Sequence, residues 1–294
     1  MEPKVSVILA TYRRNESLKK ALCSLLEQTY KSLEIILVDD NDEESFNKKV
    51  KKLVDGLDSN VDIKLVVNHP NLGSAKARNV GISMASGEFI TFLDDDDIYL
   101  PKKIEYQVKY MIQSKADYCI TDLELFNVYD RLIEKRVRNY IRNYDSKSLM
   151  KYHLMYHMTG TDTMMFRKEY LDEIGGFDAI DVGDEFYLMK KAIEGGGCFG
   201  YLNRCDIKAY IHTNNNGLSS GQSKIDGENQ LYKFKKNYFY DMDKKTIRYI
   251  RMRHYAVLAF AYLRMKKIIS FFKYAFRAFF SGPLECLKLI SELK

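Results

Sequence analysis

Four consecutive aspartates, Asp94 to Asp97, are the residues whose type and spacing suggest chemistry most directly. They follow the apolar run Phe89–Leu93 and precede Pro101, which starts a predicted helix. Adjacent carboxylates repel one another unless a cation lies between them, and Mg²⁺ and Mn²⁺ prefer carboxylate oxygens, often together with substrate phosphates. The run therefore predicts a divalent metal site that bridges protein and diphosphate. The alternative is a solvated acidic turn.

Two other polar clusters also follow short, β-branched apolar runs. Thr11-Tyr12-Arg13 comes after Val5–Ala10, and Asp39-Asp40 comes at the end of Leu33–Val38. Ligands of open α/β sheets bind beyond the carboxyl ends of the strands. We therefore expect all three clusters to converge on one edge of a sheet.

Helical patterns separate these apolar runs. One helix is predicted after Asn15 or Ser17, a polar helix after Asn41, and another over residues 73–85, with a third strand near residues 61–67. Continuous apolar strands between helices indicate a parallel sheet that is covered on both faces. The first strand is not followed by GxGxxG, and GxxxxGK[ST] is absent from the sequence, which argues against a dinucleotide dehydrogenase and a P-loop NTPase.

Charge and cysteine content limit the class of protein further. Residues 231–294 hold 15 Lys and Arg against 4 Asp and Glu, whereas the other 230 residues hold 31 and 36. A slightly acidic body thus carries a basic tail, and a net charge of +6 does not suggest a nucleic-acid partner. Five scattered cysteines without a CxxC favour reduced thiols in a cytoplasmic protein. We expect neither a secretion signal nor a membrane-spanning helix.

Several motifs occur in a fixed order between residues 4 and 212: Val5–Arg13, Leu37–Asp40, Ala77–Gly81 with Ala85–Asp97, and Gly175–Asp178. Together they resemble the family-2 inverting glycosyltransferases of the GT-A fold. The resemblance implies an α/β domain over residues 1–220, with a Rossmann-like, mostly parallel central sheet and helices on both faces. Residues 221–294 would form a basic, aromatic-rich helical module.

The resemblance also implies roles for the strand-end residues. Asp94-Asp95-Asp96 matches the family's Asp-x-Asp motif, so Asp96 would bind the metal ion and Asp94 or Asp95 would lie against the ribose. The other implied nucleotide-binding residues are Thr11, Tyr12, Arg13, Asp40 and Arg78. A carboxylate acceptor at Asp40 suits the imide N–H of uracil and favours UDP-sugars weakly over GDP-sugars. Arg78 would steady the diphosphate, and the alternative for it is an ordinary surface arginine.

Inversion at the anomeric carbon needs an in-line attack by an acceptor hydroxyl whose proton a carboxylate removes. The family's Glu-Asp pair is reversed here, as Asp184-Glu185. Spacing from the following helix aligns Glu185 with the usual base, and Asp184 is the second choice. Acidic residues in a first helical turn also serve as caps, so one of the two carboxylates is expected to do so.

Two further segments carry expected contacts. Asp162, in a stretch resembling the family's strand beneath the donor sugar, is predicted to bind sugar hydroxyls. His212 starts a Gly/Asn/Ser-rich loop and is predicted to contact the metal ion or the diphosphate. That loop, residues 212–220, is expected to close over the donor and exclude water. His153 and His157 have metal-compatible spacing, but their aromatic and methionine neighbours favour packing.

The basic tail is predicted to contain two helices, over residues 244–264 and from about residue 266 to Gly282-Pro283. In the second, Lys266, Ser270, Lys273 and Arg277 form a narrow polar stripe on an otherwise phenylalanine-rich surface. An aromatic helix with cationic edges suits an anionic membrane interface. A helical hairpin and a homodimer contact are the alternatives.

These features predict a cytoplasmic, Mg²⁺- or Mn²⁺-dependent inverting glycosyltransferase, located either in the cytosol or at the inner face of the membrane. Its acceptor would be a hydroxyl of a glycan or lipid-linked glycan, in cell-surface polysaccharide synthesis. A sugar nucleotidyltransferase is one alternative, but residues 10–17 lack its Gly-rich, basic loop. A non-catalytic nucleotide-sugar or glycan-binding module is the other, because the acidic pair is altered.

Overall fold

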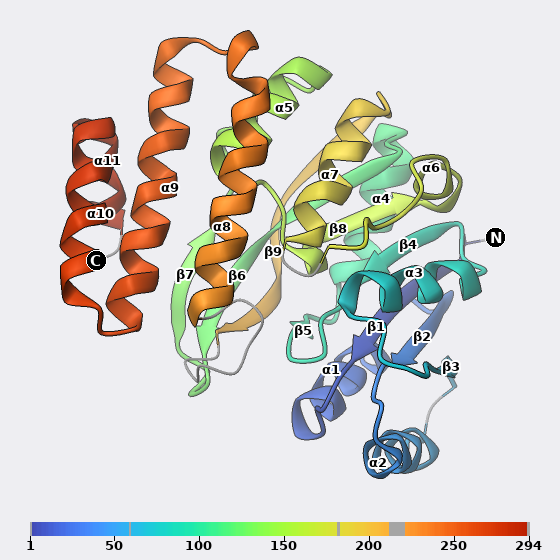
Figure 1. The fold of residues 1–294 in the computed structure, drawn as a ribbon. Coiled ribbons are helices and arrows are strands. Elements are labelled where there is room, and N and C mark those ends of the chain that lie inside the picture. The colour runs from blue at the N-terminus through green and yellow to red at the C-terminus, as the bar shows by residue number, and fades with distance from the viewer. Residues whose placement is uncertain (1, 59, 181–182, 212–220, 293–294) are drawn as a thin grey trace. The chain divides into compact units, whose positions relative to one another are not determined.

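The computed structural model describes residues 2–58, 60–180, 183–211 and 221–292 (Figure 1). The chain divides into two compact units. One contains Met1–Ser146 and Met158–His212, and the other contains Lys147–His157 and Thr213–Lys294. Residues 147–157 thus group with the C-terminal helices, whereas the expected division at residue 220 places them in the N-terminal domain.

The N-terminal unit is built on one sheet with the strand order β3-β2-β1-β4-β8-β6-β9-β5, and β7 pairs with β6. The first half is parallel, as predicted: β1 (Val5–Thr11), β2 (Leu33–Asp39), β3 (Asp62–Val67) and β4 (Phe89–Phe92). The second half is mixed and contains β5 (Ile98–Tyr99), β6 (Tyr118–Asn127), β7 (Leu132–Arg136), β8 (Met164–Arg167) and β9 (Phe199–Ile211). Among the described residues of that half, β6 and β9 run parallel and the other pairings are antiparallel.

Helices cover both faces of the sheet. Alternate residues of β1 point to opposite sides, so each face presents apolar side chains to a layer of helices. Val5, Val7 and Leu9 pack in one apolar core with buried residues of α1 (Glu16–Leu26) and α4 (Lys103–Ser114). Ile8 faces the other side, where α3 (Ser74–Met84) approaches closely. The remaining helices of this unit are α2 (Glu44–Asp55), the 3₁₀ turn η1 (Thr161–Thr163), α6 (Lys168–Glu173) and α7 (Asp184–Glu194).

The C-terminal unit is helical. Its elements are α5 (Ser146–Tyr156), α8 (Gly221–Lys235), the 3₁₀ helix η2 (Lys236–Asp241), α9 (Lys244–Arg264), α10 (Ile268–Ser281) and α11 (Pro283–Glu292) (Figure 1). Asp243 caps α9 by accepting a hydrogen bond from the N–H of Thr246 at 2.8 Å. Buried Met252, Ala278 and Cys286 join α9, α10 and α11. In the described part of the chain, the helices fall short of the length or the apolar character that crossing a bilayer requires.

Candidate functional site

The strand-end clusters converge at the carboxyl edge of the parallel half-sheet. Thr11 Oγ1 donates a hydrogen bond to Asp95 Oδ2 at 2.8 Å, and the backbone N–H of Tyr12 donates to the same oxygen at 3.2 Å. Burial and the neighbouring charge of Asp96 raise the pKa of Asp95 to about 7, although the Thr11 hydroxyl opposes the shift. The end of β1 therefore holds the turn of residues 94–97, here called the acidic loop, in place through Asp95.

Asp40 fixes the segment that leads into α3. One carboxylate oxygen of Asp40 accepts hydrogen bonds from the Asn68 side chain at 2.9 Å and the Leu72 N–H at 3.0 Å, and the other accepts from the Gly73 N–H at 2.9 Å. The carboxylate is buried, so these bonds replace the lost hydration. Asp40, predicted to meet the nucleotide base, thus has a structural role in placing the first turn of α3.

Arg13 and Arg14 turn in different directions from the end of β1. The Arg13 guanidinium pairs with Glu43 at 2.6 Å, and its backbone, at φ 54°, donates a hydrogen bond to Asn41 Oδ1 at 2.7 Å. Arg14, to which the sequence analysis gave no role, pairs with Asp96 Oδ2 at 2.9 Å. The predicted metal ligand Asp96 therefore faces a cation in this structure.

Arg78 connects the acidic loop to α7. Its Nη1 lies 2.5 Å from Asp184 Oδ2 and its Nη2 lies 2.7 Å from Asp94 Oδ1, and the residue is buried. Burial alone would lower the pKa of Arg78, but the two carboxylates more than offset this and raise it. Burial raises the pKa of Asp184 to about 6 even though Arg78 opposes the shift. Arg78 is thus a buried, permanently charged bridge and not an ordinary surface arginine.

Asn79 is a positioning residue that the sequence analysis missed. Its side chain donates a hydrogen bond to the Phe177 carbonyl and accepts one from the Phe177 N–H, both at 2.8 Å. Gly176, at φ 60°, lies so close that a Cβ atom there would be 2.6 Å from Asn79 Oδ1. This clamp ties α3 to the segment that precedes α7. In the sequence, the presence of both Ala77-Arg-Asn and Gly175-Gly-Phe was the signal that could have indicated this contact.

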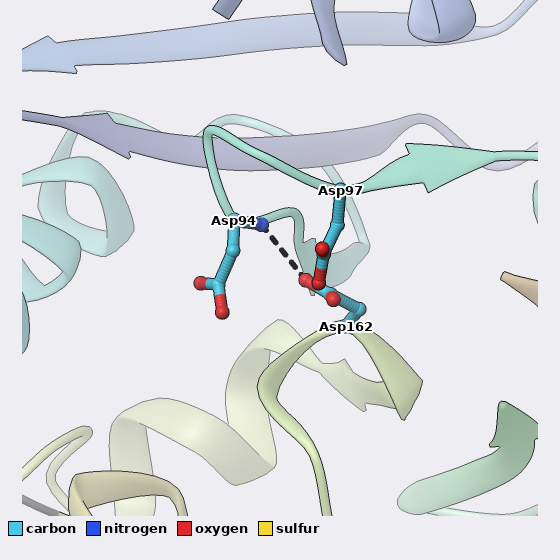
Figure 2. A group of neighbouring side chains, drawn as sticks. All are labelled: Asp94, Asp97 and Asp162. Carbon is cyan, nitrogen blue, oxygen red and sulfur yellow. Dashed lines mark hydrogen bonds between the residues drawn. The ribbon is translucent and has the colours of Figure 1, made fainter. Parts of the chain in front are cut away.

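Three carboxylates from two distant segments of the chain lie close together. Asp94 and Asp97 come from the turn after β4, and Asp162 comes from η1; one oxygen from each lies within 4.8 Å of the others (Figure 2). The Asp94 N–H donates to Asp162 Oδ1 at 2.8 Å, and the Tyr210 N–H donates to Asp97 Oδ1 at 2.7 Å. Asp162, predicted to bind the sugar, lies in this cluster, and Asp97 was predicted only as part of the aspartate run.

The donor set of this cluster fits a hard divalent cation. Asp97 and Asp162 are both buried, and burial together with the neighbouring carboxylates raises the pKa of Asp162 to about 7 and that of Asp97 well above its usual range. Near neutral pH the cluster therefore binds either protons or a cation. Asp94, Asp97 and Asp162 would hold such an ion, because each offers one carboxylate oxygen within 4.8 Å of the other two.

The acidic pair starts α7, as predicted. Gly183 precedes the helix at φ 78°, and Asp184 Oδ1 accepts a hydrogen bond from the Glu185 N–H at 2.9 Å. Asp184 thus accepts a hydrogen bond at the start of the helix and pairs with Arg78. Glu185 is half-buried in the first turn.

The histidines discussed in the sequence analysis lie in the C-terminal unit or outside the described part of the chain. His212 and the loop that it begins, residues 212–220, are not among the described residues. His153 and His157 lie in the C-terminal unit with ring centroids 6.0 Å apart. Burial and the charges of Lys235 and Arg253 lower the pKa of His157 well below its usual range. This environment agrees with the expected packing role.

Comparison with solved structures identifies the fold. Residues 1–349 of Staphylococcus aureus TarS in complex with UDP-GlcNAc superpose with a TM-score of 0.60 at 17% identity, over 94% of this chain and 91% of that one. The mannosyltransferase PcManGT from Pyrobaculum calidifontis, in complex with GDP-Man and Mn²⁺, gives a TM-score of 0.63 at 17% identity, over 99% and 79% of the two chains. The sheet and its acidic edge thus define a protein of the GT-A class.

The family follows from the sequence comparison. The profile described as "Glycosyl transferase family 2" matches residues 6–175, which is more than half of the chain, and the chain belongs to this family. An Escherichia coli relative, named UDP-Glc:alpha-D-GlcNAc-diphosphoundecaprenol beta-1,3-glucosyltransferase WfgD, is 33% identical over 42% of this chain and 47% of its own. A Methanocaldococcus jannaschii relative, an uncharacterized glycosyltransferase, is 28% identical over 74% of each chain. The first curated relatives are matched over only about half of their length.

Proposed function

We propose that this protein is a divalent-metal-dependent, inverting glycosyltransferase that transfers a sugar from a nucleotide diphosphate donor, with UDP-sugars favoured. The acceptor would be a hydroxyl of a glycan or lipid-linked glycan. The observation that carries the proposal is the cluster of Asp94, Asp97 and Asp162 beside the Arg78 bridge, at the sheet edge where the strands end. The name of the E. coli relative, which specifies UDP-Glc and a diphosphoundecaprenol-linked sugar, supports the donor and acceptor classes.

For the donor, we assign the nucleotide to the end of β1 and the diphosphate to the acidic edge. Tyr12 is 42% exposed and Thr11 anchors Asp95 beside it, which supports a base and ribose site there. The carboxylate cluster supports a metal site at Asp94, Asp97 and Asp162, and Asp96 would join it only by releasing Arg14. When bound, the ion would neutralise the charge that develops on the departing diphosphate.

For the general base, the contacts favour Glu185. Asp184 is committed to Arg78 at 2.5 Å and to the first turn of α7, so a proton arriving there would weaken a buried ion pair. We therefore assign proton removal from the acceptor hydroxyl to Glu185 and a positioning role to Asp184, which orients Arg78 toward Asp94. A general base contributes typically 10²–10⁴-fold to the rate.

Separate amide substitutions test this assignment. Glu185→Gln should lower the kcat for UDP release from UDP-sugars with Mn²⁺ by about 10²-fold or more, while UDP binding, followed by the thermal shift, stays unchanged. Asp184→Asn should lower kcat less and should also lower the melting temperature, because it removes one partner of a buried arginine. A panel of UDP- and GDP-sugars identifies the donor. Wild-type turnover in Glu185→Gln would show that the base is another residue.

A further inference from the structure

The aromatic surface of α10 has no role in the proposed transfer reaction. Six apolar side chains of this helix are between 40% and 89% exposed: Ile268, Ile269, Phe272, Phe276, Phe279 and Phe280. At 100° per residue their positions fall within an arc of about 120°, so they form one continuous stripe, here called the aromatic face. Leu284 and Leu287 of α11, 72% and 54% exposed, are two further apolar side chains beyond the end of α10. Contiguous exposed apolar surface of this kind marks an interaction site.

A helical hairpin, one of the alternatives for the basic tail, is formed by α9 and α10, but it uses the opposite side of α10. Ala278 is buried against Met252 and Ala256 of α9, and the Tyr274 ring stacks on Tyr262 with centroids 5.3 Å apart and an interplanar angle of 11°. Packing within the unit therefore leaves the aromatic face exposed.

The charges around the aromatic face have one sign. Lys273 and Arg277 border the face along its length, and Lys266 and Lys267 lie at its N-terminal end; all four are exposed. Between Asp243 and Glu285, the 41 residues of positions 244–284 contain ten Lys or Arg and no Asp or Glu. The partner that complements this surface is apolar at its centre and anionic around it.

We propose that the aromatic face of α10 is a docking surface for an anionic lipid bilayer, with the phenyl rings in the interface and the four cations at the level of the lipid phosphates. Fourteen residues of α10 span about 21 Å, less than the roughly 30 Å hydrocarbon core. The helix would therefore lie along the bilayer surface.

A second copy of the chain fits the aromatic face less well. A two-fold symmetric contact places the same patch on both partners, so one interface would contain Lys266, Lys267, Lys273 and Arg277 of both copies. The surrounding segment offers no carboxylate to compensate them. An anionic membrane removes this repulsion and provides an apolar environment for the rings.

Flotation of the full chain with vesicles tests the proposal. The wild-type protein should bind phosphatidylcholine vesicles that contain about 30 mol% phosphatidylglycerol at least tenfold more tightly than pure phosphatidylcholine vesicles, and about 1 M salt should weaken this binding. The variant F272S/F276S/F280S, and separately K273E/R277E, should each lower binding to anionic vesicles at least tenfold. The matched control Y129S/L132S/I133S removes three exposed apolar side chains of the N-terminal unit and should bind as the wild type does.

UDP binding with Mn²⁺ and the melting temperature, measured on the same variants, separate this proposal from the enzymatic one. Both should stay at wild-type values, because the substituted side chains are exposed. Wild-type vesicle binding by both α10 variants would overturn the proposal. So would a wild-type dimer, detected by light scattering, that F272S/F276S/F280S converts to a monomer while no form of the protein binds vesicles.

Discussion

Arg78 lies between Asp94 and Asp184, whereas the next carboxylates, Asp97 and Asp162, have no comparable cation at hydrogen-bonding distance in the described part of the chain. The single arginine therefore compensates only part of the buried negative charge. Burial raises the pKa of Asp162 to about 7, which means that folding favours the protonated carboxyl. A divalent ion would relieve the same repulsion in place of protons. Protons and the metal ion therefore compete for Asp97 and Asp162, so metal binding should depend on pH.

The residue-scale prediction concerns Asp162→Asn, whose amide oxygen can still accept the Asp94 N–H. Because the pKa of Asp162 is higher in the folded chain than in the unfolded one, the carboxyl destabilises the ion-free protein increasingly as pH rises from about 4 to about 7. Asp162→Asn should therefore raise the free energy of unfolding in EDTA at pH 8, on the order of 1–3 kcal/mol, and weaken Mn²⁺ binding at least tenfold.

Thermal denaturation with EDTA and with Mn²⁺ measures both effects. Asp96→Asn is the control, because Asp96 lies outside the cluster and pairs with Arg14; its Mn²⁺ affinity should change less. The opposite order of the two affinities would return the metal site to Asp96, the ligand that the family resemblance implies.

At the scale of elements, α3 positions more of the site than any single strand end. Asp40 holds its first turn, Arg78 reaches both the acidic loop and α7, and Asn79 clamps the segment before α7. These contacts require α3 to lie close to the sheet. Gly81 makes this possible, because a Cβ atom there would be 2.5 Å from Ile8 Cγ2 and 3.3 Å from Val38 Cγ2.

The element-scale prediction is that Gly81→Ala destabilises the protein by about 1–3 kcal/mol through overpacking, although alanine is the better helix former by about 1 kcal/mol. The displaced helix should also lower kcat, because Arg78 moves with it. Urea denaturation of Gly81→Ala, Ile8→Ala and the double variant measures the coupling. Gly81→Ala should be less harmful in the Ile8→Ala background, and strictly additive effects would contradict close packing as the cause.

At the scale of the whole molecule, the C-terminal unit is assembled from two separate parts of the chain. Within it, the contacts that join α5 to α9 and its cap residue Asp243 include three: Lys151 pairs with Asp243 at 2.8 Å, Arg253 donates to the Met155 carbonyl at 2.8 Å, and the rings of Tyr156 and Tyr249 lie 5.1 Å apart. The segment of residues 147–157 therefore depends on helices that follow it by about 90 residues in sequence.

The corresponding prediction concerns removal of residues 213–294. The shortened chain keeps α5 but loses all three contacts, so it should bind the dye ANS and melt about 5–10 °C below the full chain. A chain that ends at residue 282 retains α9 and these contacts, and it should resemble the full chain more closely. Calorimetry and ANS fluorescence provide the comparison. An unchanged melting temperature without ANS binding, after removal of residues 213–294, would mean that α5 is stable without α9.

The sequence alone determined the strands of the parallel half-sheet, the helices between them and the polar clusters at their ends, because these follow from local periodicity and from the way parallel strands align. It also determined the two long helices of the basic tail, which follow from their helical pattern and, at the end of the second, from Gly282-Pro283. Only the tertiary structure decided which carboxylates meet. Asp162 joins Asp94 across 68 residues, and Asp96 turns to Arg14, because the direction of a side chain beyond a strand end depends on the turn and on neighbours from distant segments. The grouping of α5 with α9 and the exposure of the aromatic face were decided in the same way, since a helical pattern shows that a face is apolar but not what covers it.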